Sequence, residues 1–317
     1  MAERMVYISG EYFAESDARI SVFDSAVMLG DTATESTRTF LHRPFKLAEH
    51  IRRLYYSLKV MRIDAAMTPD EMMEVTLQVV GRNLPLYAED EDLWIVHNVS
   101  RGAYPPSGDQ STKRMPTVII HTAPMNLDYW AEFYVRGCHA VTPSSRVTPA
   151  QSLDPKLKHR SRLGYTLADL EVKLVDPRAQ GIILDLDGFL AENKGGNFFI
   201  VRDGTLRTPP TWQALAGITR ETTIEIAERR GISVEVCPLQ PYDVYTADEA
   251  FLTSTPYCIM PATRFNGLPV GEGKVGPITK SLLEGWFELA GFDIVDRAIR
   301  KLGESLRGEL LAERGRT

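Results

Sequence analysis

Residues 184–219 constrain the fold most strongly, because they combine an acid, a hairpin and a helix start in one short stretch. Glu192 follows apolar residues and precedes a glycine-containing segment. The turn sequence Arg202-Asp203-Gly204 is typical of a hairpin between two strands. Ala216-Gly217-Ile218-Thr219 then begins a predicted helix that Gly231 ends. The stretch therefore predicts a strand hairpin followed directly by a helix, with an acid set among glycines.

The first half of the chain mixes strand and helix patterns. Residues 45–63 are predicted to form a helix, because apolar side chains recur there at helical spacing. These side chains are Leu47, Ile51, Leu54, Leu58 and Met61. The next helix is predicted to begin with Thr68 as N-cap, Pro69 at the first helical position and Glu71 completing a capping box. Strands are predicted over residues 5–9, 93–99 and 117–122.

The pattern breaks around residues 123–128, which predicts a domain boundary. We expect an N-terminal α+β domain over residues 1–124, a linker over 125–130 and a C-terminal domain over 131–317. A helix is predicted over residues 162–174, where leucines recur at helical spacing: Leu163, Leu167, Leu170 and Leu174. Helices and strands do not alternate strictly, so two α+β domains are favoured over a doubly wound sheet.

Composition excludes several classes of function. The net charge of -6 argues against a protein that mainly binds nucleic acid. No apolar run is long enough to cross a membrane, and the N-terminus lacks the apolar core of a signal peptide. The three cysteines form no CxxC pair and the six histidines have no metal-ligand spacing, so no metal site is expected. A reducing cytoplasm is the expected compartment.

A lysine-bearing segment precedes the acid by 34 residues: Asp154-Pro155-Lys156-Leu157-Lys158. A lysine amine becomes a covalent catalyst when it forms a Schiff base with a carbonyl. Lys158 stands in a short extended stretch just before the leucine-rich helix, where a side chain can be aimed into a cleft. Lys156 projects to the same side of the chain, so periodicity does not separate the two lysines, and most lysines are solvated surface groups.

The acid and the helix start complete a set of parts that fits pyridoxal phosphate (PLP). Glu192 could keep a pyridine nitrogen protonated, or it could be a solvated turn residue. The free N–H groups at Ile218 and Thr219 suit a phosphate, and Gly217 lets the backbone approach it closely. The plainer alternative is an ordinary threonine N-cap. Thr253-Ser254-Thr255, after a strand, offers further hydroxyl donors.

Several longer motifs carry a family resemblance. They are AENKGGNFFIVRDGTLRTPP, LAGITR, ADEAFLTST and GEGKVGPIT, with Gly30-Asp31 and EHIRRL in the first half. Over about residues 5–285 the chain resembles the class IV aminotransferases, the fold-type IV PLP enzymes. These include branched-chain and D-amino-acid aminotransferases, (R)-selective amine transaminases and aminodeoxychorismate lyases. The resemblance implies a small N-terminal α+β domain, a larger C-terminal pseudo-barrel domain, PLP in the cleft between them, and at least a homodimer.

The resemblance also implies roles for individual residues. Lys158, rather than Lys156, would form the Schiff base, and Glu192 would pair with the pyridine nitrogen. The phosphate would be held by Arg53, Ile218, Thr219 and Thr255, with Ile218 and Thr219 contributing backbone amides.

The substrate positions depart from each known pattern. Thr34 stands where the family usually has Phe or Tyr, and Leu163 replaces the tyrosine found five residues after the lysine in branched-chain enzymes. Glu91 falls near the place of their carboxylate-binding arginine. Pro106-Ser107-Gly108 replaces the Arg-x-His motif of D-amino-acid enzymes.

Two arginines remain as candidates for binding a substrate carboxylate. Arg38 and Arg101 could each do so, or each could belong to a structural ion pair. The implied activity is transfer of an amino group from an amino acid or primary amine to a 2-oxo acid. The alternative is an aminodeoxychorismate lyase-like PLP lyase, although Glu35 stands where that lyase has a threonine.

Overall fold

The computed structural model describes residues 3–105 and 114–315, which divide into two compact units. The N-terminal unit comprises Met1–Met125 with Leu157–Arg162, and the C-terminal unit comprises Asn126–Lys156 with Leu163–Thr317. The boundary at Met125 falls in the segment expected to be a linker, but helix α4 (Asp128–Arg136) already begins there. The return of Leu157–Arg162 to the N-terminal unit differs from the expected continuous C-terminal domain.

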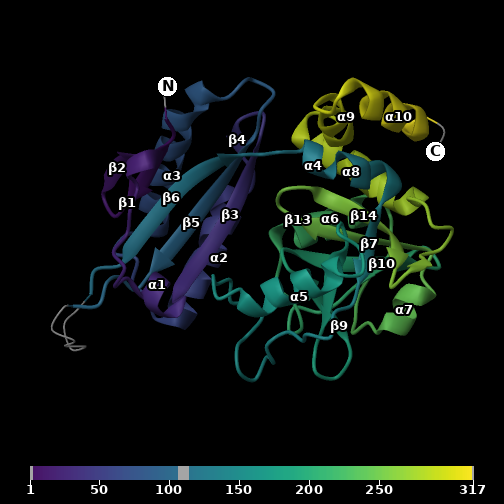
Figure 1. Cartoon of the computed structure of the whole chain (residues 1–317), viewed down its shortest axis with the longest axis horizontal. Coiled ribbons are helices and arrows are strands. Elements are labelled where there is room, and N and C mark those ends of the chain that lie inside the picture. Colours follow the sequence, from purple (N-terminus) through teal and green to yellow (C-terminus); the bar gives the residue numbers. More distant parts are fainter. Residues whose placement is uncertain (1–2, 106–113, 316–317) are drawn as a thin grey trace. The chain divides into compact units, whose positions relative to one another are not determined.

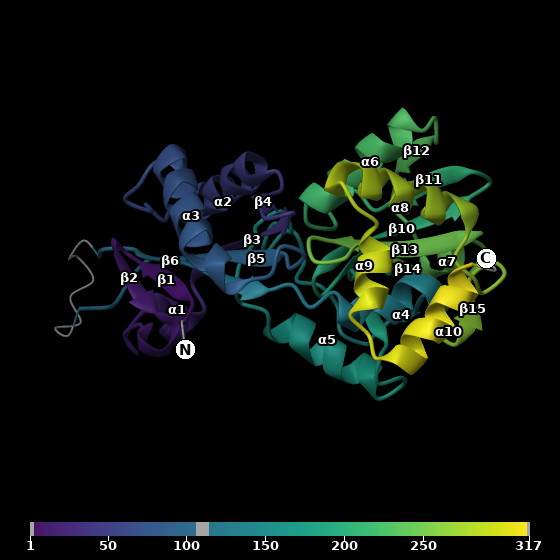
Figure 2. The ribbon, with the colours of Figure 1, turned by 90° about the horizontal axis from the view of Figure 1, so that it is seen from above.

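The N-terminal unit is a sheet covered by two helices. Its strands are β1 (Met5–Ile8), β2 (Glu11–Ala14), β3 (Thr32–Phe40), β4 (Arg43–Pro44), β5 (Leu93–Ser100) and β6 (Thr117–Pro124). They form one antiparallel sheet in the order β2-β1-β6-β5-β3-β4. Its helices are α1 (Ser25–Leu29), α2 (Leu47–Met61) and α3 (Pro69–Asn83), with short 3-10 turns η1 (Glu15–Asp17) and η2 (Leu84–Leu86). Helices α2 and α3 lie side by side on one face of this sheet (Figures 1 and 2).

Local sequence explains both covering helices. The predicted apolar stripe of α2 is buried at Ile51, Leu54 and Leu58, which pack into the core of the unit. The predicted capping box of α3 is confirmed: the Glu71 amide donates to Thr68 Oγ1 at 3.2 Å, and the Thr68 amide donates to the Glu71 carboxylate at 2.6 Å. Helix α3 therefore starts where its capping residues specify, and the apolar face of α2 binds that helix to the sheet.

The C-terminal unit is built around a ring of strands. The strands are β7 (Cys138–Val141), β8 (Gln180–Leu184), β9 (Leu190–Asn193), β10 (Gly196–Arg202), β11 (Thr205–Thr208), β12 (Val234–Val236), β13 (Glu249–Ser254), β14 (Cys258–Phe265) and β15 (Leu268–Pro269). Pairing runs β10-β13-β14-β7-β8-β9, and β9 pairs again with β10, which closes the ring. This closure confirms the expected pseudo-barrel in a two-domain α+β fold.

Helices surround the ring. They are α4, α5 (Leu163–Lys173), α6 (Ile218–Arg229), α7 (Pro241–Tyr245), α8 (Pro277–Ala290), α9 (Ile294–Arg300) and α10 (Glu304–Arg314). Helices α6 and α8 pack against β13, and α4 packs against β14. Within the described part of the chain, no helix combines the length and apolarity that crossing a membrane requires.

Helix α5 is present as predicted, but its leucines face outward. Ala168 and Val172 are the buried residues of this helix. The leucine stripe, defined as Leu163, Leu167, Leu170 and Leu174, is between 52% and 88% exposed. The helix therefore packs on its small-residue face and presents its leucines to the outside of this chain.

Candidate functional site

Lys158 lies in an extended segment that adds to the edge of β3. Ala33 and His159 form an antiparallel bridge, and the Thr34 amide donates to the Lys158 carbonyl at 3.0 Å. The Lys158 amide in turn donates to Ser57 Oγ on α2 at 3.2 Å. The backbone of Lys158 is thus fixed by a strand on one side and a helix on the other.

Lys156 has a different setting. Its ammonium lies 3.0 Å from the Asp154 carboxylate, and its side chain is 49% exposed. Its amide also donates to Asp154 at 2.9 Å, so the lysine belongs to a local turn. The structure therefore gives Lys156 the surface ion pair of an ordinary lysine and Lys158 a backbone anchored on two sides.

Arg53 on α2 faces a buried carboxylate on β3. Its Nε and Nη2 donate to Glu35 at 2.7 and 2.6 Å, and the Glu35 side chain is fully buried. Burial opposes the charged form of Glu35, but the Arg53 guanidinium and the His50 ring outweigh it and hold the pKa of the carboxyl well below its usual range. Burial is the largest effect on His50 and lowers its pKa; the hydrogen bond and charge of Glu35 oppose this without outweighing it, and the charges of Arg53 and Lys158 lower the pKa further. His50 is therefore neutral, and its Nδ1, 3.0 Å from Glu35, must be the donor.

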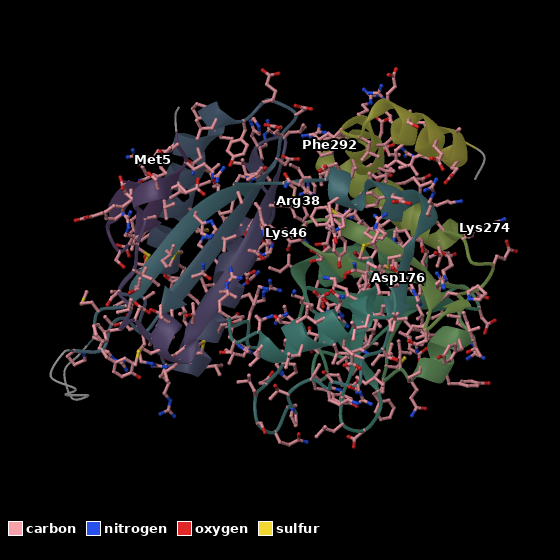
Figure 3. All side chains as sticks on the ribbon, viewed as in Figure 1. Met5, Arg38, Lys46, Asp176, Lys274 and Phe292 are labelled. Carbon is pink, nitrogen blue, oxygen red and sulfur yellow. The ribbon has the colours of Figure 1, made fainter. Side chains whose placement is uncertain are left out.

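Two of the expected substrate-binding residues lie on β3. Arg38, labelled in Figure 3, is buried, and its Nη2 is 3.4 Å from Asp92 while its Nε donates to the Thr39 carbonyl at 3.1 Å. The hydroxyl of Thr34 donates to the His97 carbonyl at 3.0 Å. The structure thus favours the ion-pair alternative for Arg38.

Arg101, just after β5, is also held by its own unit. Its Nε donates to the Asp31 carboxylate at 2.8 Å, and its Nη atoms donate to the carbonyls of Met61 and Arg62 at 2.8 and 2.9 Å. The guanidinium closes the C-terminus of α2 onto the loop before β3. The departure at Pro106-Ser107-Gly108 lies outside the described residues.

Glu192 belongs to a polar row across three strands of the ring. It lies opposite Asn197 on β10, which lies opposite Thr253 on β13, so the three side chains share one face. Glu192 Oε1 accepts from the Tyr165 hydroxyl at 2.6 Å, and Oε2 accepts from the Leu215 amide at 2.9 Å. The residue is 6% exposed. This is a buried carboxylate fixed by two donors, and it differs from the solvated turn glutamate that the sequence left open.

Tyr165 was not predicted to belong to the site. It stands on α5, seven residues after Lys158 and two after Leu163. A signal existed, since Leu163 occupies the position of an expected tyrosine and the next tyrosine follows two residues later. Because a helix advances about 100° per residue, this shift changes the direction of the ring, and only tertiary structure shows that it reaches Glu192.

At the start of α6 the backbone of Gly217 lies very close to the side chain of Asn197. Gly217 is the N-cap of α6, and no side chain caps the helix among the described residues. A Cβ at Gly217 would lie 2.1 Å from Asn197 Oδ1, so only glycine fits there. Asn197 also donates to the Leu215 carbonyl at 2.8 Å. The amides of Ile218 and Thr219 therefore begin a helix whose entry is held beside the polar row.

The turn between β13 and β14 follows Thr253, the last residue of the polar row. The hydroxyl of Thr253 is buried without a hydrogen-bond partner among the described residues. A Cβ at Gly196 would lie 2.5 Å from the Thr253 carbonyl, so this approach also requires glycine. Thr255 follows in the turn. An uncapped helix start and an unsatisfied buried hydroxyl together are suited to an anionic ligand.

Comparison with known sequences identifies a family. The sequence model described as Amino-transferase class IV matches residues 32–265. A Methanocaldococcus jannaschii relative, provisionally named a branched-chain-amino-acid aminotransferase, is 36% identical over 280 residues, 88% of this chain and 94% of its own. The branched-chain-amino-acid aminotransferase of Escherichia coli K12 is 32% identical over 290 residues, which cover 90% of this chain and 92% of that protein.

Solved structures give the same result. A branched-chain amino acid aminotransferase of T.th., solved with pyridoxamine 5'-phosphate, superposes with a TM-score of 0.82 at 28% identity, covering 92% of this chain and 95% of that one. A branched-chain amino acid aminotransferase of Escherichia coli superposes with a TM-score of 0.84 at 30% identity, covering 91% and 95%.

Proposed function

The chain belongs to the class IV aminotransferases, and from this premise we propose that it moves an amino group from an amino acid or primary amine to a 2-oxo acid by way of Lys158. The protein is a transaminase, and its cofactor is pyridoxal 5'-phosphate. The observation that carries the proposal is the fixed Lys158 strand in one unit together with the anchored Glu192 in the other.

The residues of the C-terminal unit fit this cofactor. The uncapped start of α6, with the amides of Ile218 and Thr219, suits its phosphate, and Gly217 provides the close approach. The unsatisfied Thr253 hydroxyl belongs to the same polar row as Asn197, which lies beside Gly217, and Thr255 lies in the turn after it. When bound, pyridoxal phosphate supplies an electron sink for the carbanion of the donor.

Each proposed residue then has one task. The Nζ atom of Lys158 would accept the proton released from the reacting carbon of the donor and would donate it again later in the transfer. Glu192 holds a proton on the pyridine nitrogen, and its two hydrogen bonds keep the carboxylate in place. Arg53, the amides of Ile218 and Thr219, and Thr255 hold the phosphate, which keeps the ring from shifting during the proton transfers.

The names of the relatives support a branched-chain amino acid as the donor. Thr34 is smaller than the aromatic residue that the family usually has at this position. Bulkier amines should therefore be tested as donors beside the branched-chain amino acids. The three cysteines are free thiols, which supports the expected reducing cytoplasm.

We further propose a homodimer. The exposed leucine stripe of α5 is an apolar surface of the C-terminal unit, and Val27, Met28 and Leu29 of α1 are between 55% and 63% exposed on the N-terminal unit. Contiguous exposed apolar side chains are typical of an interface with another chain.

Borohydride reduction of the loaded enzyme, followed by peptide mapping, tests the proposal. We expect the label on Lys158, and Lys158→Ala should abolish both labelling and transfer while Lys156→Ala retains them. A label on Lys156 would contradict the assignment. Incubation with a donor alone should produce pyridoxamine phosphate; release of pyruvate from aminodeoxychorismate without an acceptor would instead indicate the lyase.

A further inference from the structure

An amino-acid donor brings a carboxylate, and the arginines expected to bind it are already paired. Arg38 is bonded to Asp92 and Arg101 to Asp31. Arg38 is almost fully buried. Arg101 directs its Nε and both Nη atoms to Asp31, Met61 and Arg62, so neither guanidinium presents its donors to a second carboxylate. A different cation of the N-terminal unit is therefore needed near Lys158.

Arg160 occupies such a position. It lies two residues after Lys158 in the extended segment, and its amide donates to the Thr32 carbonyl at 3.0 Å. Side chains alternate along an extended chain, so Arg160 and Lys158 project from the same face, with their Cα atoms about 6.6 Å apart. Thr34 lies beside Lys158 across the bridge and pairs with Asn98 on β5. These side chains therefore share one face of the sheet.

A neutral amide orients the Arg160 side chain. Its Nε donates to Asn98 Oδ1 at 2.7 Å, which extends the guanidinium over β3. Among residues 3–105 and 114–315, neither Nη atom has a hydrogen-bond partner and no carboxylate forms an ion pair with this arginine. Part of the residue remains exposed to solvent. The two Nη atoms are the end of the guanidinium that binds a carboxylate in a bidentate manner.

The nearby charge that acts on Arg160 is that of Arg162, which is also positive. Partial burial lowers the pKa of Arg160, and the charge of Arg162 lowers it further. The pKa of His121 is lowered mainly by burial, with a contribution from the Arg160 charge. An arginine remains protonated under these conditions, so this face carries positive charge that an anion can neutralise.

We propose that Arg160, oriented by Asn98, binds the carboxylate of the amino-acid donor and of the 2-oxo acid acceptor through its Nη atoms. This inference rests on the proposed function, in which Lys158 on the same face reacts with the donor. It makes Arg160 the residue that favours amino acids over amines without a carboxylate.

The first test measures binding without turnover. Calorimetry of the holoenzyme with 4-methylpentanoate, which has the carboxylate and chain of leucine but no amine, should show Arg160→Gln weakening the affinity by roughly ten- to a hundredfold. Arg160→Lys should recover part of the loss. Arg162→Gln is the matched charge control and should change the affinity by less than about threefold, as a screened nearby charge does. Equal losses in both Gln variants, or none, would overturn the proposal.

Asn98 provides a second variant. Asn98→Ala should weaken 4-methylpentanoate binding less than Arg160→Gln does. The double variant should bind no more weakly than Arg160→Gln alone, because Asn98 acts through the arginine. Additive losses would assign Asn98 a separate role and contradict the orientation argued here.

The half-reaction with donor alone separates this inference from the proposed function. In Arg160→Gln the second-order rate constant should fall for L-leucine and stay unchanged for 3-methylbutylamine, which lacks only the carboxylate. Equal falls for both donors would overturn the inference. If the wild-type holoenzyme reacted with neither donor, the proposed function would fail, while the calorimetric result would still decide whether Arg160 binds a carboxylate.

Discussion

Glu35 contacts Arg53 with both carboxylate oxygens, so the arginine assigned to the phosphate is oriented within its own unit. Arg53→Ala should weaken cofactor binding by roughly ten- to a hundredfold, because a charge-assisted contact is lost. Glu35→Gln should weaken it too, and should also lower the free energy of unfolding by about 3–5 kcal/mol, the usual effect of breaking a buried pair.

A cofactor titration and a urea denaturation curve measure these two effects. Arg52→Ala, the exposed neighbour on α2, is the control and should alter neither. If Glu35→Gln left both the cofactor affinity and the urea midpoint unchanged, Glu35 would not position Arg53.

The Tyr165 hydroxyl gives a second prediction at this scale. Tyr165→Phe removes one of the two donors to Glu192 and should slow the half-reaction by roughly tenfold, as loss of a hydrogen bond to a charged group does. Glu192→Gln should slow it more, because the neutral amide no longer holds the proton on the pyridine nitrogen, while cofactor binding persists. Rapid-mixing absorbance measures both rates. A wild-type rate in Glu192→Gln would show that another acid serves the ring.

At the residue scale, motifs predicted the candidate residues but not their partners. Glu192 stands in a distinctive local sequence, whereas only the family resemblance separates Lys158 from Lys156. The pairing of Arg53 with Glu35 joins α2 to β3, and the contact of Tyr165 with Glu192 joins α5 to β9. Such contacts depend on how elements pack, which the local sequence does not specify.

At the scale of elements, prediction succeeded where the determinants are local. Helix α3 begins at its predicted capping box, and the apolar stripe of α2 faces the core. The segment expected to be a linker holds the start of α4, whose buried residues pack against the ring. For α5 the periodicity predicted a helix correctly but could not show which face is buried, since small residues, rather than the leucines, meet β8.

The leucine stripe leads to a prediction about assembly. Replacing Leu167 and Leu170 with Glu should shift the protein towards monomer, because two charges would be placed in an apolar interface. Sedimentation velocity measures the change. Leu77→Glu on α3, at a residue that is 52% exposed like Leu167, is the control and should leave the oligomeric state as it is. A double variant that sediments like the wild type would show that α5 lies outside the interface.

For the whole molecule, buried histidines set the response to acid. Burial lowers the pKa of His97 from 6.5 to about 4. The unfolded chain therefore binds more protons than the folded one between these values, and stability falls as the pH falls from about 6.5 towards 4. His97 alone contributes a loss of about 3 kcal/mol by pH 4. The lowered pKa values of His50 and His121 act in the same direction.

Urea midpoints at pH 7 and pH 5 check this prediction. The wild-type midpoint should be lower at pH 5, and His97→Gln should show a smaller difference between the two. Equal wild-type midpoints would contradict the argument, whatever the stability of the variant.

Lys158 lies in the segment Leu157–Arg162, and the parts of the chain directly before and after this segment belong to the C-terminal unit. The chain passes between the units after Met125, after Lys156 and again after Arg162. A gene fragment encoding only residues 1–125 would omit the lysine and leave the edge of β3 open to strands of other molecules. The two units are therefore not interchangeable modules: a cut after Met125 loses the reactive lysine, and a cut after Arg162 takes Asn126–Lys156 away from the C-terminal unit.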